Sequence, residues 1–118
     1  MDIALYSPPG TGQMTVRSAG RFLRLNIPQI SYIESAGRKV IVHTDRTEIA
    51  YYDRMSELES ALSADFFRIH RGYLVNLSRV AGVEPGGVIL DSGERLLLSK
   101  YKKNAFLAAY QSYRQNRG

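Results

Sequence analysis

Cysteine is absent from this chain of 118 residues. Its absence excludes disulfides and thiolate metal sites and is compatible with a reducing cytoplasm. No apolar run approaches the roughly 20 residues that a membrane-spanning helix needs. Residues 1–13 lack the basic start and the apolar stretch of a signal peptide. These absences predict a soluble, cytoplasmic protein with no membrane partner.

Signatures of catalysis are also scarce. His43 and His70 are the two histidines, and they lie far apart in the sequence. No cluster has metal-ligand spacing, no Gly-x-Ser-x-Gly elbow is present, and no phosphate-cradling glycine loop precedes a helix. We therefore expect no enzymatic activity, no metal and no cofactor. His43 falls in an apolar run, and we interpret it as a satisfied or edge histidine.

Acidic residues are few in the second half of the chain. Residues 1–60 contain seven basic and seven acidic residues, whereas residues 61–118 contain nine basic and four acidic ones. The second half therefore carries the whole net charge of +5. A one-sided excess of this kind attracts polyanions such as nucleic acid, although a solvated basic surface would give the same composition.

What the sequence does contain is a succession of short β-type runs separated by turn residues. Such closely spaced strands pair antiparallel, because parallel pairs need long crossovers. We expect one mainly β domain over residues 14–118, behind a flexible tail or linker of residues 1–13. The expected strands span residues 14–17, 21–25, 30–34, 39–44, 48–52, 66–69, 73–77, 80–84, 88–90 and 95–98.

Two helices are expected among these strands. Asp53 is a good N-cap for a short helix, in which Met55, Leu58 and Leu62 fall at helical spacing. Ser99 can cap a second, C-terminal helix that starts near Lys100. The apolar face of that second helix would consist of Phe106, Leu107, Tyr110 and Tyr113.

The segment from Phe66 to Asn76 is the most unusual stretch. Apolar residues at both of its ends, Phe67 among them, look like the anchors of two strands, and Gly72 lies where the backbone can turn sharply. A basic loop on such a scaffold suits groove or phosphate recognition, and Arg71 could donate bidentate hydrogen bonds to guanine or phosphate. A hairpin with solvated cations is the alternative. The cationic or potentially cationic residues of the loop are Arg68, His70 and Arg71.

Two other short segments are basic. Arg38 and Lys39 follow Gly37 at a tight turn, and three lysines surround Tyr101 at the start of the expected C-terminal helix. Cations at a helix N-terminus oppose the helix dipole, so an anionic partner explains them better than stability does. An ordinary exposed hairpin and a solvated helix face remain the alternatives. The three lysines are Lys100, Lys102 and Lys103.

The whole of Phe66 to Asn76 resembles the hallmark of the LytTR family of bacterial DNA-binding domains. That hallmark is an aromatic residue, an Arg, a His followed by Arg or Asn, a small residue, an aromatic or aliphatic residue, and then Val-Asn. Flanking segments resemble the family as well: Ile30 to Ser35, Tyr51 to Leu62, and Leu96 to Lys100 followed by lysines. The similarity extends over roughly residues 14–110.

The resemblance implies a fold and a mode of binding. The fold is an elongated, sandwich-like arrangement of short antiparallel sheets with one small helix between them and a C-terminal helix. The function is sequence-specific binding of double-stranded DNA by loops inserted in successive major grooves, for transcription regulation, as in response-regulator output domains of two-component systems. Repeated half-sites in the DNA, a dimer on DNA and a receiver or sensor domain upstream of this chain are compatible with it.

The resemblance also assigns residues to three DNA-binding loops. Two departures from the family pattern concern these loops. Many members have Arg where this chain has Lys100, which lacks the bidentate fork, and Ser is common at the position of Gly72. The first loop contains Arg38 and Lys39, the second His70 and Arg71, and the third Ser99 and Lys100. The neighbouring cations Arg68, Lys102 and Lys103 are expected to bind DNA with them, from their positions in the basic segments above.

A module that binds RNA or another polyanion is the alternative function. The chain has eight tyrosines and four phenylalanines, which could stack on unpaired bases. They fall mostly at expected core positions rather than on an open basic face, so the sequence favours double-stranded DNA.

Overall fold

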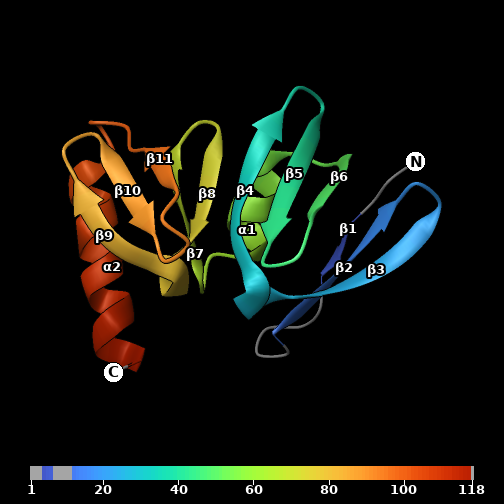
Figure 1. Cartoon of the computed structure of the whole chain (residues 1–118), viewed down its shortest axis with the longest axis horizontal. Helices are drawn as coiled ribbons and strands as arrows, with labels where there is room; N and C mark the ends of the chain where they lie inside the picture. The colour runs from blue at the N-terminus through green and yellow to red at the C-terminus, as the bar shows by residue number, and fades with distance from the viewer. Residues whose placement is uncertain (1–3, 7–11, 118) are drawn as a thin grey trace.

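Three antiparallel sheets in a row make up most of the molecule (Figure 1). A computed structural model describes residues 4–6 and 12–117. The first sheet has the order β1-β2-β3, the central sheet β6-β5-β4-β8-β7, and the third sheet β11-β10-β9. The predicted mainly β fold is confirmed, and the described part measures 40 × 30 × 24 Å.

The strands have the following bounds. The first sheet contains β1 (Ala4–Tyr6), β2 (Gln13–Ser18) and β3 (Arg21–Asn26). The central sheet contains β4 (Ile30–Ala36), β5 (Lys39–Thr44), β6 (Glu48–Tyr52), β7 (Phe66–His70) and β8 (Tyr73–Asn76). The third sheet contains β9 (Val80–Glu84), β10 (Gly87–Leu90) and β11 (Arg95–Leu97). Short 3₁₀ turns, Ile27–Gln29 and Leu77–Arg79, lead into β4 and β9.

Two helices accompany the sheets: α1 (Met55–Ala61) between β6 and β7, and α2 (Lys103–Arg117) at the C-terminal end. Both were predicted, but both predicted N-caps are wrong. Arg54 occupies the N-cap position of α1 without a side-chain cap. Asp53 lies one residue earlier, where its Oδ1 accepts from the Arg54 amide at 2.7 Å and its Oδ2 from the Tyr51 hydroxyl at 2.9 Å.

The C-terminal helix begins later than expected. A turn precedes it, in which the amide of Lys102 donates to the carbonyl oxygen of Ser99 at 2.9 Å. Lys100 and Lys102 therefore belong to a loop, and Lys103 is the first residue of α2. The predicted apolar face is confirmed, because Phe106 is fully buried and the other three residues are partly buried against the same cluster.

The central sheet is covered on both faces, which explains the near-continuous apolar runs of β4 and β8. Ile33 and Leu74 belong to a core cluster shared with β2, β5, β6 and α1. Tyr32 and Val75, the next residues along the same strands, point to a second cluster shared with the third sheet and α2. Side chains alternate between the two faces of a strand, so each face packs on a different core.

Asn76, the last residue of the unusual segment, is a structural residue. It is 1% exposed. Its side-chain nitrogen Nδ2 donates to the carbonyl oxygens of Ile30 at 2.8 Å and Ile27 at 3.2 Å, and its Oδ1 accepts from the Ser78 backbone amide at 3.0 Å. Buried polar groups need such partners, and these bonds tie the end of β8 to the start of β4.

The predicted boundary between a tail and a domain remains a prediction. Residues 1–3 and 7–11 lie outside the described residues. Within the expected tail, Ala4–Tyr6 pairs antiparallel with β2, and Gln13 is the first residue of β2. No helix in the described ranges is long and apolar enough to cross a membrane.

Candidate nucleic-acid interface

The three basic segments lie side by side along one edge of the molecule. The β4–β5 turn, the β7–β8 turn and the connection from β11 to α2 follow one another along the upper edge in Figure 1. Two backbone hydrogen bonds join them: Ser35 donates to the carbonyl oxygen of Gly72 at 3.0 Å, and Ser99 donates to that of Ile69 at 2.9 Å. The fold thus brings together cations from residues 38 to 103.

The first loop is a tight turn between β4 and β5. Gly37 has a φ of +66°, a conformation that favours glycine. Arg38 follows it and is exposed, whereas Lys39 is half-buried with its Nζ 4.8 Å from the centre of the Tyr52 ring. Arg38 makes no ion pair with any described residue. Of the two, Arg38 is therefore the freer to contact a partner.

The two arginines of the second loop have different roles: Arg68 is bonded within the turn, and Arg71 is exposed. Arg68 donates from Nη2 to the carbonyl oxygen of Arg71 at 2.8 Å and lies 3.5 Å from a carboxylate oxygen of Glu59. Its side chain is 25% exposed. Arg68 therefore stabilises the turn through these bonds and is less available to a partner. The Arg71 side chain is exposed and unpaired among the described residues, which makes it the protruding cation of this loop.

His70 and Gly72 complete the turn. The amide of Gly72 donates to Nδ1 of His70 at 3.1 Å, so a neutral His70 carries its proton on Nε2, where it can donate to a ligand. Gly72 was predicted to allow a sharp turn, but it does not have a positive φ. A Cβ built on it would meet Nδ1 of His70 at 3.5 Å, an ordinary contact. A small side chain therefore fits at this position.

The third loop is a basic turn held against β7. Ser99 is half-buried, and its amide makes the bond to Ile69 described above. Lys100, Lys102 and Lys103 are exposed. Tyr101 between them is 85% exposed, and the Nζ of Lys100 lies 5.2 Å from the centre of its ring. Ser99 thus acts as the anchor and the lysines as the charged surface.

In the part of the chain that the structure describes, the exposed cations of the loop edge lack acidic partners, whereas Arg79 at the opposite end of the molecule is paired. None of the exposed cations in the three loops has an acidic partner among the described residues. At the other end, Arg79 pairs with Asp45 at 2.6 Å and Asp91 at 2.8 Å. Those hydrogen bonds raise the pKa of Arg79, and the bond from Arg79 holds the pKa of Asp45 below its usual range. The loop edge is left with uncompensated positive charge, which suits a polyanion.

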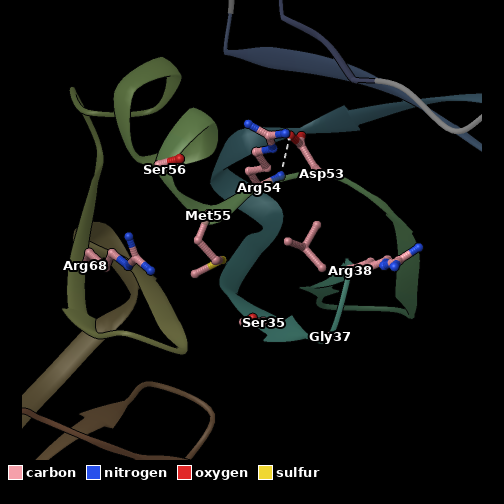
Figure 2. Close-up of a pocket in the computed structure, with 9 residues that line it drawn as sticks. Ser35, Gly37, Arg38, Asp53, Arg54, Met55, Ser56 and Arg68 are labelled. Atoms are coloured by element: carbon pink, nitrogen blue, oxygen red, sulfur yellow. Dashed lines mark hydrogen bonds between the residues drawn. The ribbon is translucent and has the colours of Figure 1, made fainter.

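Arg54 is a candidate that the sequence did not reveal. A cavity of about 560 Å³ opens beside the first loop and α1, and Figure 2 shows its lining. Arg54 lines it and is exposed; its backbone amide donates to Asp53, but its guanidinium makes no ion pair in the described ranges. Its proximity to Arg38 depends on the packing of α1 beside β4 and β5, which no local pattern encodes. The cavity is lined by Ser35, Gly37, Arg38, Val40, Asp53, Arg54, Met55, Ser56 and Arg68.

His43 is away from these loops and is confirmed as a satisfied histidine. Its Nε2 lies 2.5 Å from a carboxylate oxygen of Glu34 and its Nδ1 3.3 Å from one of Glu48. Its ring stacks on Tyr32 with 4.1 Å between centres. Burial raises the pKa of Tyr32, as does its hydrogen bond to Glu94. These contacts link His43, Tyr32 and three glutamates, and they occupy both ring nitrogens of His43.

Comparisons with known proteins agree with this geometry. Residues 20–111 match the LytTr DNA-binding domain family. Among solved structures, the chain is similar to the LytTr DNA-binding domain of a protein from Bacillus cereus described as a methyl-accepting/DNA response regulator. The TM-score is 0.72 at 21% identity, over 82% of this chain and 94% of that one; at that identity the likeness shows the fold. No curated protein matches the chain.

Proposed function

This chain belongs to the LytTR family of DNA-binding domains, and from that premise we propose that it binds double-stranded DNA sequence-specifically through its three basic loops and thereby regulates transcription. The observation that carries the proposal is the alignment of three loops with unpaired cations along one edge (Figure 1). Such an edge presents positive charge to phosphates and places side chains on anchored turns within reach of base edges.

The order of the loops supports contacts in successive major grooves. The three loops follow one another along the longest axis of the molecule, over which the whole described molecule, first sheet included, extends 40 Å. One turn of B-DNA is about 34 Å long, and its major groove, about 12 Å wide, admits a β-hairpin turn. We propose that the first and third loops, at the two ends of this series, face different grooves on the same side of a duplex.

The loop residues suit different tasks. Arg38 and Arg71 are exposed guanidinium groups on short, anchored turns, and a planar fork can donate two hydrogen bonds to guanine. Lys102 and Lys103 have compact, flexible charges that suit phosphates. Lys100 can contact either a base or a phosphate. Arg54, beside the first loop, extends the surface for phosphate contacts.

RNA is the less favoured partner. The major groove of an A-form helix is deep and narrow, so short loops cannot reach its base edges, and unpaired RNA is recognised by stacking on aromatic side chains. Along the loop edge Tyr101 is 85% exposed, whereas Tyr52 is 46% exposed and has the Lys39 ammonium group over its ring. A single open ring is a poor platform for a run of stacked bases.

The wider arrangement follows from the same proposal. We infer that the target contains repeated half-sites, that two copies of the domain occupy them as a dimer on DNA, and that a receiver or sensor domain outside this chain controls binding in the cytoplasm. A dimer on repeated half-sites gives the affinity and the length of target that a single small domain lacks.

Binding measured by fluorescence anisotropy against salt concentration tests the proposal. We expect nanomolar-range affinity for a selected duplex, and a logarithmic salt slope of about −0.9 for each phosphate contacted. An RNA duplex or single strand of the same sequence should compete poorly. Binding without preference for any duplex over bulk DNA, even at low salt, would contradict the proposal.

A further inference from the structure

Tyr101 has an exposed ring that the fold does not use. It is 85% exposed, the largest value among the exposed large hydrophobic side chains of the described residues. The three lysines around it supply positive charge for an anion, and the Tyr101 hydroxyl can donate a hydrogen bond to a phosphate, but neither accounts for the exposed apolar face of the ring. The ring therefore calls for an explanation separate from that of the lysines.

The backbone of the loop that carries the ring is held by hydrogen bonds at both ends. On one side, Ser99 is bonded to Ile69 of β7, and on the other, Lys102 is bonded to Ser99 and starts the turn into α2. The Nζ of Lys100 lies 5.2 Å from the ring centre, within the range of a cation–π contact. A ring on such a short, bonded turn is presented outward in a restricted set of orientations.

Duplex DNA offers one apolar group to a protein in its major groove, the C5-methyl of thymine. The third loop lies on the same edge as the β7–β8 turn that contains Arg71 (Figure 1). The bond from Ser99 to Ile69 joins this loop to β7. We propose that Tyr101 reads thymine: its ring packs on a thymine methyl in the major groove, beside the base or phosphate contacted by Lys100. The inference rests on the proposed function, and it adds a specificity-determining residue to the third loop.

This role compensates for the chemistry of Lys100. A lysine at that position lacks the planar fork with which an arginine discriminates guanine. An apolar contact next to it would restore selectivity in the third loop by a different route, favouring thymine over cytosine. The loop would then read a methyl group rather than a pair of acceptors.

Replacement of thymine by deoxyuridine removes the methyl group alone and so tests the proposal. In a selected duplex, each thymine is replaced in turn, and affinities are measured for the wild type, Tyr101→Ala and Tyr101→Phe. For the wild type, one position should lower the affinity about threefold to fivefold, the change expected for one buried methyl group. Tyr101→Ala should lose that dependence, and Tyr101→Phe should keep it because the ring remains.

Phe22→Ala is a matched control. Phe22 is 62% exposed, and the guanidinium of Arg17 lies 5.6 Å from the centre of its ring, but it belongs to β3 in the first sheet. It should keep the full methyl dependence. An unchanged deoxyuridine penalty in Tyr101→Ala would overturn the inference while leaving the proposed function intact. The same holds if Tyr101→Phe loses as much as Tyr101→Ala, because the hydroxyl would then make the contact. Absence of specific binding by the wild type would overturn both.

Discussion

Removal of the Arg71 side chain should strongly weaken specific recognition without disturbing the fold. Its guanidinium makes no hydrogen bond or ion pair within the described ranges, and its backbone carbonyl, which accepts from Arg68 at 2.8 Å, remains in the Ala variant. Exposed substitutions of this kind change the free energy of unfolding by about 0.5 kcal/mol or less. The melting temperature of Arg71→Ala should therefore stay within about 3 °C of the wild type.

The effect on binding should be much larger. A bidentate contact to a base discriminates by about 1–3 kcal/mol, which corresponds to roughly a fivefold to 150-fold change, and we expect Arg71→Ala to lose at least about tenfold in specific affinity. Non-specific binding loses a single positive charge, and the logarithmic salt slope should change by about 0.9 or less. Anisotropy titrations on a selected duplex and on a scrambled duplex of equal length separate the two quantities.

Arg46→Ala is the matched control for Arg71→Ala. Arg46 is exposed and has no ion pair among the described residues. It lies in the β5–β6 turn, about 17 Å along β5 from the first loop. The same charge is removed, so specific binding should change little. A loss of less than about tenfold for Arg71→Ala, or an equal loss for Arg46→Ala, would refute the assignment of Arg71 as a base-reading residue.

Four further predictions follow from the geometry. Lys102→Ala should weaken binding to all duplexes alike and reduce the salt slope by about one unit; a changed base preference would instead show that Lys102 reads a base. Phe106→Ala empties a fully buried site and should cost about 3–5 kcal/mol in urea unfolding, and a normal unfolding midpoint would contradict the described core. Gly72→Ser should keep the melting temperature and DNA affinity, because only His70 Nδ1 approaches the added Cβ, at 3.5 Å; a large loss of stability would be inconsistent with this turn. The pKa of Asp45 is lowered in the folded protein by its bond to Arg79, so this bond stabilises the fold above the unfolded pKa of about 3.9 and is lost as the pH falls through the folded value. The difference in unfolding free energy between wild type and Arg79→Met should therefore shrink as the pH is lowered from neutral to acid, and a difference that grows would contradict the pairing.

The strands were predictable because their signals are local. Alternating or continuous apolar residues bounded by turns predict ten strands, and all ten are present. The predicted bounds differ from those in the structure by at most two residues. Val40 and Val42 in β5 show the signal at its clearest, since both are buried and the residues between and beside them are not. Such patterns reflect which side chains face a core, and the alternation of apolar and polar residues can be read directly from the sequence.

Helix starts and side-chain roles were less predictable because they depend on tertiary contacts. Asp53 and Ser99 are good capping residues, yet each helix begins later than a cap at that residue would place it. Asp53 instead accepts from the amide of Arg54, and the carbonyl oxygen of Ser99 accepts from the amide of Lys102. Arg68 was grouped with the DNA-binding cations, but its bond to the Arg71 carbonyl exists only once the hairpin has formed. Arg54 became a candidate only because α1 packs beside the first loop.

The half-burial of Phe67 shows the same limit. It was expected to be a core anchor, and it does pack on the second core, edge-to-face against Phe106 with 5.7 Å between ring centres. Its neighbour Phe66 is buried in the first core instead. Two adjacent aromatic residues on a strand point to opposite faces, and the sequence does not say which face is better covered. Phe67→Ala should accordingly destabilise the protein less than Phe106→Ala.

Selection of bound sequences from random DNA duplexes tests the central claim most directly. If the three loops read DNA along one edge, the wild type should enrich a motif in which conserved bases fall in segments about one helical turn apart. Arg71→Ala should lose one of those segments and Arg46→Ala should lose none. Enrichment of no motif at all, or of the same motif by the wild type and Arg71→Ala, would contradict sequence-specific recognition by these loops.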